Sequence, residues 1–196
     1  MYRLIPIGLA ALSLAACSTV RETNTPRTAT EEMLVSKAAD EAAEMLTAKI
    51  PQHSRVFLDS SNFDALDGKY AIGTVQDALL RHGCRMADSK ANSDVVVLLR
   101  SGASAIDSNE TLIGLPPLSL PIPLAGAIST PKVALWDVER REGVAKFAIT
   151  AVDAKTGELV ASTGPNFGTS HVKDYTLLLF FSWRHQDIAP DSVDNK

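Results

Sequence analysis

The stretch Asp94-Val-Val-Val-Leu-Leu-Arg100 decides the fold. A continuous apolar run rich in β-branched residues is typical of a strand that is covered on both faces. We therefore expect residues 94–100 to form a central strand of a sheet. A shorter run, Arg55-Val-Phe-Leu-Asp59, predicts a second strand that ends in a turn at residues 60–62, and residues 84–87 predict a third, shorter one.

Two amphipathic helices are predicted around these strands. The first begins with a capping box from Thr28 to Glu31, or alternatively with Thr30 as its N-cap, and ends before Pro51. Its apolar face, at helical spacing, consists of Leu34, Ala38, Ala42, Met45 and Leu46. The second helix runs from about Gly68 to His82 and stops at Gly83. Small alanines on the first helix favour close packing on a sheet.

The C-terminal half has the pattern of an antiparallel meander. Residues 132–138, 144–152 and 158–162 are extended segments, separated by turn signals at residues 139–143 and 153–157. Residues 177–183 form a last hydrophobic element, either strand or helix. The sequence therefore predicts an α+β fold in two layers, a mixed sheet with two N-terminal helices on one face and a C-terminal antiparallel meander. One domain covers residues 28–185, and residues 186–196 are a polar tail.

The N-terminal segment has the pattern of a bacterial lipoprotein signal. An apolar run follows Arg3 and is too short to span a bilayer. It ends in Leu14-Ala15-Ala16-Cys17, which resembles the lipobox. The resemblance implies that residues 1–16 are a cleaved signal peptide and that Cys17 receives acyl chains such as palmitate, which anchor the protein in a membrane. The alternatives for this segment are an uncleaved membrane-surface helix or a buried free thiol.

Two further expectations follow from the lipobox. Lipoproteins kept at the inner membrane typically carry Asp after the cysteine, so Ser18 implies sorting to the periplasmic face of the outer membrane. Residues 18–27 are polar and contain Pro26, and together with Cys17 they read as a flexible tether. Ten such residues reach about 30 Å when extended.

Composition and motifs argue against several classes of function. The net charge is −4 and there is no basic cluster, so no nucleic acid partner is expected. Cys84 is the second of two cysteines, and we expect a small buried hydrophobic residue there. The histidines, which are dispersed without metal-site spacing, are His53, His82, His171 and His185. No nucleophile elbow or phosphate loop is present, so we expect no metal, no cofactor and no catalysis.

One glycine-rich polar cluster, residues 164–168 followed by Thr169, Ser170 and His171, offers a ligand-binding alternative. A turn where a strand ends is the preferred interpretation. Ser170 and His171 do not form a dyad, because neighbours on an extended chain point to opposite faces.

Residues 111–130 contain no charge, and four prolines exclude a membrane-spanning helix. One interpretation is an extended loop folded over the sheet, and the other is a polyproline-like arm that docks on a partner or touches the membrane. The first is preferred, because a long exposed apolar arm is a liability. The candidate interaction residues are Leu115, Pro116, Pro117, Leu118, Leu120, Pro121, Ile122 and Pro123, of which the loop interpretation buries the leucines and the isoleucine.

Two resemblances to known families add to this reading. Ser93-Asp94 before the valine-rich strand, and the Asp153-x-x-Thr-Gly157-Glu-Leu hairpin, resemble the small α/β domain of the Tol-system periplasmic protein's amino-terminal part, of the curli-secretion lipoproteins and of the lipoproteins that activate penicillin-binding proteins. Residues 27–31, 131–135, 143–147 and 157–165 are similar to an uncharacterised family of proteobacterial lipoproteins. That similarity implies a shared architecture and no assigned activity. The proline-rich stretch departs from the pattern of the penicillin-binding-protein activators.

Three functions are therefore open. The favoured one is a non-catalytic envelope interaction or assembly protein that uses a sheet edge or the proline-rich stretch to bind an envelope protein. The second is a subunit of an oligomeric secretion or channel complex, a homo-oligomer assembled through heterologous contacts. The third is a small-ligand binder or hydrolase near residues 164–171.

Overall fold

The computed structural model describes residues 27–47, 49–122 and 126–188; of residues 120–122 and 126–128 it describes the backbone alone. Cys17, Ser18 and the signal peptide lie outside the described residues. The elements in chain order are α2 (Ala29–Glu44), β1 (Arg55–Asn62), α3 (Gly68–Arg81), β2 (Arg85–Met86), a single 3₁₀ turn η1 (Lys90–Asn92), β3 (Val95–Leu115), β4 (Ser119–Ile122), β5 (Gly126–Ser129), β6 (Val133–Asp153), β7 (Leu159–Leu177) and β8 (Phe181–Gln186).

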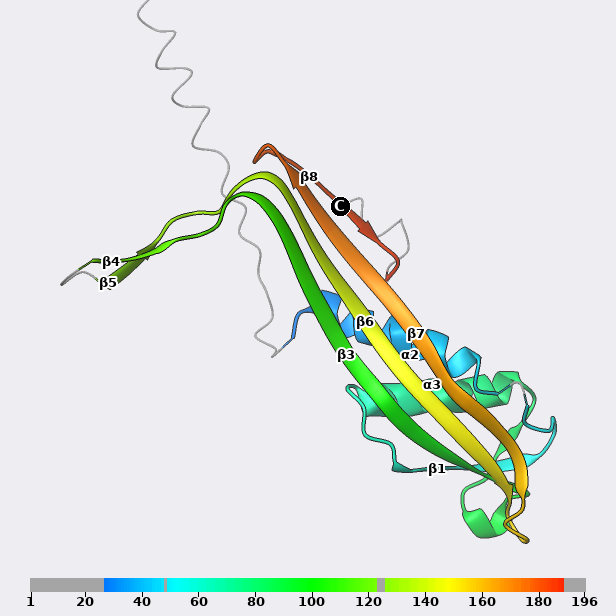
Figure 1. Ribbon diagram of the computed structural model, residues 1–196. Coiled ribbons are helices and arrows are strands. Elements are labelled where there is room, and N and C mark those ends of the chain that lie inside the picture. The colour runs from blue at the N-terminus through cyan, green and yellow to red at the C-terminus, as the bar shows by residue number, and fades with distance from the viewer. Residues whose placement is uncertain (1–26, 48, 123–125, 189–196) are drawn as a thin grey trace, which may run out of the picture.

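The main sheet is mixed and has the strand order β2-β1-β3-β6-β7-β8. Strand β1 is parallel to β2 and β3, whereas β3, β6, β7 and β8 are antiparallel neighbours. Both helices pack on one face of this sheet (Figure 1). The predicted α+β fold, with N-terminal helices on one face and a C-terminal meander, is confirmed.

Three expected turns lie inside strands instead. Residues 60–62 continue β1, residues 139–143 lie in the middle of β6, and residues 164–168 lie within β7. Strand β6 is paired on both sides over this region, since Arg141 is opposite Ser108 of β3 and Val172 of β7. Backbone hydrogen bonds to both neighbours outweigh the local turn preference of charged residues and glycine.

Other boundaries agree with the sequence. Thr28 forms the predicted capping box with Glu31, although α2 ends at Glu44, before the expected stop at Pro51. The β6–β7 turn is held by Asp153, whose Oδ1 accepts hydrogen bonds from the backbone of Lys155 and Thr156, both at 2.8 Å. The turn closes at Gly157, which has a φ of 75°.

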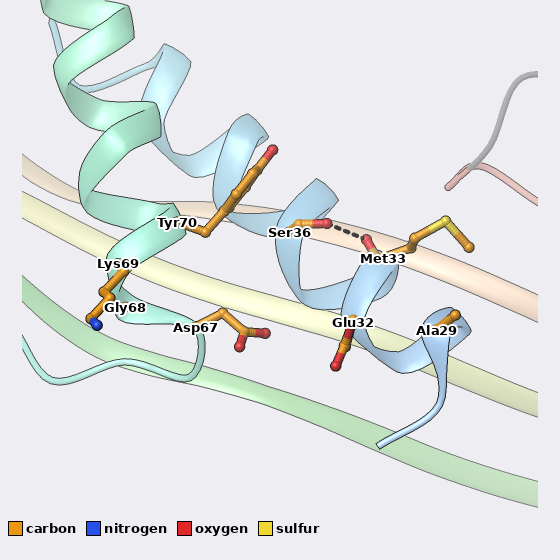
Figure 2. Close-up of a pocket in the computed structure, with 8 residues that line it drawn as sticks. All are labelled: Ala29, Glu32, Met33, Ser36, Asp67, Gly68, Lys69 and Tyr70. Carbon is orange, nitrogen blue, oxygen red and sulfur yellow. Dashed lines mark hydrogen bonds between the residues drawn. The ribbon is translucent and has the colours of Figure 1, made fainter. Parts of the chain in front are cut away.

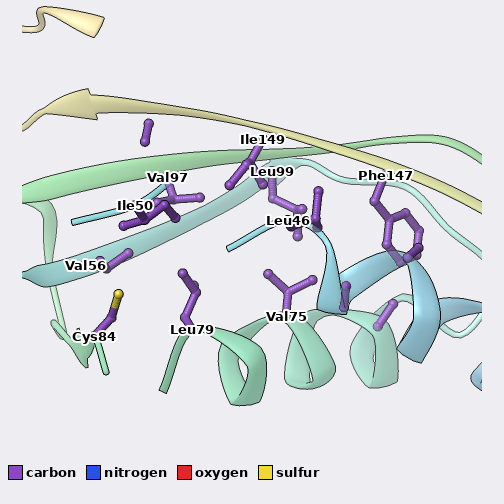
Figure 3. Close-up of a cluster of buried hydrophobic side chains, with 14 of the residues drawn as sticks. Leu46, Ile50, Val56, Val75, Leu79, Cys84, Val97, Leu99, Phe147 and Ile149 are labelled. Atoms are coloured by element: carbon purple, nitrogen blue, oxygen red, sulfur yellow. The ribbon is translucent and has the colours of Figure 1, made fainter. Parts of the chain in front are cut away.

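The core lies between the helices and the end of the sheet where β3 begins, β6 ends and β7 begins. Val56, Val75, Leu79 and Phe147 belong to a single buried cluster (Figure 3). Val97 and Leu99 point into this cluster, but Leu98 and Arg100 are exposed on the opposite face. The expectation that residues 94–100 are covered on both faces is therefore wrong beyond Val97, because the described helices cover only one face.

The long strands β3, β6 and β7 continue well beyond the helices (Figure 1). We call this far part the distal end; it comprises residues 111–115, 133–137 and 175–183. The face of the sheet opposite the helices is called the open face. The β4–β5 hairpin begins at the distal end, and so does the turn between β7 and β8.

Candidate interaction surface

We call residues 116–130 the arm. Its described residues, 116–122 and 126–130, leave the main sheet as a separate antiparallel hairpin (Figure 1). Ser119 pairs with Ser129, and the Leu118 and Thr130 backbones are joined by a 2.9 Å hydrogen bond. Leu115 is 64% exposed and Leu118 is 54% exposed. The preferred expectation of a loop that folds over the sheet and buries these two leucines is therefore wrong: with β4 and β5 paired to each other, the arm has its own backbone partners and stands apart.

The remaining arm residues named from the sequence fall into two groups. Pro116 and Pro117 are exposed between β3 and β4. The backbones of Leu120, Pro121 and Ile122 lie in β4, while their side chains, like the whole of Pro123, lie outside the described part of the chain.

The base of the arm is fixed by an ionic cluster. Lys132 Nζ donates a hydrogen bond to Glu110 Oε1 at 2.7 Å and another to the carboxylate of Asp137. These two hydrogen bonds raise the pKa of Lys132 to about 12. Asp137 is buried, and through Lys132 this residue of β6 is linked to Glu110 of β3.

A second apolar feature lies beside the arm base. Leu178, Leu179 and Phe180 form the β7–β8 turn, and together with Phe181, the first residue of β8, we call them the apolar tip. Phe180 is 83% exposed and Phe181 is 63% exposed. The tip is joined to the arm base by two backbone hydrogen bonds, Leu178 N to Leu135 O at 2.9 Å and Leu179 N to Ala134 O at 3.1 Å.

Three large aromatic residues meet behind the apolar tip. The rings of Tyr175 and Trp183 are stacked with centroids 5.2 Å apart, and Trp136 lies 6.0 Å from each. All three are at positions that share the open face of the sheet. The sequence interpretation missed this surface, although the unbroken run from Leu177 to Phe181 signalled it. A run of large apolar residues without alternation does not fit a half-buried strand.

The alternative site near residues 164–171 does not assemble into a catalytic group. Ser170 is buried and its hydroxyl donates a 2.7 Å hydrogen bond to the Leu34 carbonyl of α2. His171 lies on the other face, where its Nδ1 is 2.9 Å from Asp187. The prediction that Ser170 and His171 do not form a dyad is confirmed by these separate partners.

A surface pocket of about 630 Å³ lies between the first turns of α2 and α3 (Figure 2). It is lined by Ala29, Glu32, Met33, Ser36, Asp67, Gly68, Lys69 and Tyr70. Asp67 is engaged by Arg27, which donates two hydrogen bonds of 2.6 and 2.7 Å and lowers the carboxyl pKa. Ser36 donates to the Met33 carbonyl. Tyr70 donates its hydroxyl hydrogen bond to the Asp40 carboxylate.

The remaining candidates for reactive or metal-binding side chains form no site among the described residues. Cys84 is buried in the core, as expected, and burial raises the pKa of its thiol. Within the described residues, no cluster of three or more histidine, cysteine, aspartate or glutamate side chains is arranged to hold a metal ion. None of the described helices has the length and apolarity that crossing a membrane requires.

Comparison with known proteins gives a family and a distant structural likeness. The model of a protein family described as "Family of unknown function (DUF6655)" matches residues 11–186. No curated protein matches the chain. Among solved structures, the LpoB C-terminal domain from Salmonella enterica is similar at 12% identity and a TM-score of 0.35; the match covers 68% of this chain and 96% of that one.

Proposed function

The chain belongs to DUF6655, a family of unknown function, and we propose that it is a lipoprotein whose arm binds another protein of the cell envelope. In this proposal acyl chains on Cys17 hold it at the periplasmic face of the outer membrane. The observation that carries the proposal is the charge-free arm, whose described backbone stands away from the sheet and whose Leu118 is exposed, as is the adjoining Leu115 of β3.

An exposed apolar projection of this kind costs solubility unless a partner covers it. Its backbone is already paired as a hairpin, so binding requires little ordering of the chain, and the lost conformational entropy is small. The ionic cluster of Lys132 with Glu110 and Asp137 holds the chain directly after the arm against β3 and β6. These features support a docking element.

The anchor supports the same role from the sequence side. Several acyl chains give stable membrane residence, since each buried methylene contributes about 0.8 kcal/mol. Ser18 supports the outer-membrane location. A Ser18→Asp variant tests that location: it is expected to move the protein to the inner-membrane fraction on a sucrose gradient, and an unchanged distribution contradicts the assignment.

Site-specific photo-crosslinking in living cells tests the docking role. A photoreactive residue at Leu118 is expected to give discrete adducts with one or a few envelope proteins. The matched control is Leu159, which is 66% exposed but lies at the β6–β7 turn, the other end of the sheet. Equal adducts from both positions, or none from Leu118, contradict the proposal. An adduct of twice the chain's mass identifies the partner as a second copy and favours the oligomeric alternative.

A further inference from the structure

On the open face behind the apolar tip, the type of side chain differs between three successive rows of residues. Residues that are directly opposite one another on β6, β7 and β8 form rungs across this face. From the tip inward the rungs are Phe181 with Leu177 and Trp136, then Trp183 with Tyr175 and Val138, then His185 with Lys173 and Arg140. The order is therefore apolar, aromatic with polar handles, and basic.

This order matches the depth profile of one leaflet of a phospholipid bilayer. Leucine and phenylalanine enter the acyl region, tryptophan and tyrosine gather at the headgroup level, and basic side chains face the anionic headgroups. The surface is a projecting turn in which Phe180 is 83% exposed. A projecting apolar turn suits a fluid apolar medium, which closes around it without a preformed pocket.

The backbone of the tip is also prepared for a medium without water. Leu178 N donates to Leu135 O, Leu179 N donates to Ala134 O, and Phe180 N donates to Leu177 O at 3.3 Å. An unpaired N–H group is costly in a bilayer. Here the three consecutive donors of the turn are satisfied inside the protein. To make these bonds, Leu178 and Leu179 adopt φ values of 50° and 68°, which are unfavourable for leucine.

The start of α2 points toward the same end of the sheet. Gly143, which pairs with Ser170, lies against Leu34, whereas Gly168 lies against Ala38 and Ala42. Going along α2 therefore leads away from the tip, and its first residue lies nearest to the tip. From Ser170 to Leu177 the strand spans about 23 Å, of which α2 covers about 8 Å between Leu34 and Ala29.

The segment between Cys17 and Thr28 is long enough to close the remaining distance. It reaches about 36 Å when extended. A lipid on Cys17 and the apolar tip can therefore meet the same bilayer at the same time.

We infer that the apolar tip, residues 178–181, inserts into the phospholipid surface and that the domain stands on the membrane on its distal end. This inference rests on the proposed function for the anchor. It places the base of the arm, which is hydrogen-bonded to the tip, at the level of the headgroups. The partner of the arm is then reached close to the membrane surface.

Intrinsic fluorescence tests the inference directly, because the only two tryptophans of the chain, Trp136 and Trp183, lie in the two rungs nearest the tip. The acylated full chain is reconstituted in phosphatidylethanolamine–phosphatidylglycerol vesicles whose lipids are brominated at shallow acyl positions. We expect tryptophan emission to fall by more than half relative to unbrominated vesicles. Emission that is equal in the two vesicle types overturns the inference.

A tip variant and a matched control sharpen the result. The Leu179→Asn, Phe180→Asn variant is expected to remain anchored and to lose the quenching. The control is Leu80→Asn, which removes from α3 an apolar residue that is 50% exposed, close to the 48% of Leu179. It is expected to keep the quenching. A tip variant that is quenched as strongly as the wild type overturns the inference. So does wild-type emission that shifts with protein concentration without lipid, because the tip is then covered by a second copy.

Vesicle flotation distinguishes the lipid anchor on Cys17 from the insertion of the apolar tip. A chain that floats without quenching overturns the tip insertion and leaves the lipid anchor standing. A chain that does not float overturns the anchor, and the tip is then decided by the acyl-free Cys17→Ser protein mixed with an excess of the same brominated vesicles. Quenching in that mixture supports insertion of the tip by itself, and its absence overturns it.

Discussion

The backbone of β7 touches α2 where Gly168 meets Ala38: a Cβ atom on Gly168 would lie 1.9 Å from the Ala38 carbonyl oxygen. This contact fixes how close α2 lies to the sheet.

Gly168→Ala is accordingly expected to lower the free energy of unfolding by about 2 kcal/mol or more, because the helix backbone must move to admit the methyl group. Urea denaturation followed by circular dichroism measures this. The matched control is Gly164→Ala in the same strand, where an added Cβ meets nothing within 4 Å. The control is expected to change stability by less than about 1 kcal/mol. Equal losses of unfolding free energy in the two variants would contradict the close contact between Gly168 and α2.

The apolar tip is expected to contribute little to stability. Leu179 is about half exposed and has a positive φ that asparagine adopts more readily. The relief of strain offsets the lost burial, so Leu179→Asn is expected to change the free energy of unfolding by less than about 1 kcal/mol. The contrasting variant is Leu99→Ala in the core, expected to cost about 2–5 kcal/mol. A large loss of stability on changing Leu179 would mean that this side chain contributes to packing in the fold.

Shortening the arm is expected to leave the domain intact. Replacing residues 120–128 by Asn-Gly keeps the pairing of Ser119 with Ser129 and removes the far part of the hairpin. Since the arm forms its own two-stranded sheet, the denaturation midpoint of the domain is expected to stay nearly unchanged. Crosslinking from Leu118 and complementation of a deletion strain are expected to be lost. A variant that complements fully is evidence that the arm has no docking role.

An ion pair at the start of β1 makes the stability of the fold dependent on pH. Arg55 Nη2 lies 2.9 Å from Asp94 Oδ1, and the Arg55 backbone N–H donates to Asp94 Oδ2. The side-chain hydrogen bond from Arg55, followed by the backbone one, lowers the pKa of Asp94 from 3.8 to about 2. Because the folded-state pKa lies below the ordinary one, the stabilisation is present above pH 3.8 and is lost as the pH falls toward 2.

Side-chain NMR titration checks this value. The midpoint of Asp94 is expected near pH 2 in the wild type and closer to 3.8 in Arg55→Gln. A wild-type midpoint close to the ordinary value would exclude the ion pair in solution.

The sequence was sufficient for the elements whose apolar residues alternate or cluster in the core. Residues 94–100 predicted a central strand, and Thr28 with Glu31 predicted the start of α2, because burial and capping leave local patterns. Residues 139–143 were misread as a turn, since the pairing of Arg141 with two neighbouring strands is a tertiary feature and leaves no such pattern in the charged segment itself.

The interaction surface was harder to predict for a related reason. Apolarity in a sequence does not say whether a residue is covered, so Leu118 in the arm was expected to be buried and Phe180 was not distinguished from a core residue. Their exposure follows from how far β3, β6 and β7 extend beyond the helices, which depends on the registers of three strands together. The absence of a dyad at Ser170 and His171 was predictable, because alternation along a strand is a local rule.

Anchoring by lipid on Cys17 is the premise on which the proposed location and orientation depend, and metabolic labelling with radioactive palmitate tests it most directly. Cells that express the full chain are expected to incorporate the label into the protein, which should sediment with outer membranes. Cys17→Ala is expected to abolish both labelling and membrane association while Cys84→Ala keeps them, since Cys84 is buried in the core. A wild-type chain that carries no label, or a Cys17→Ala chain that is labelled as strongly as the wild type, would contradict the account.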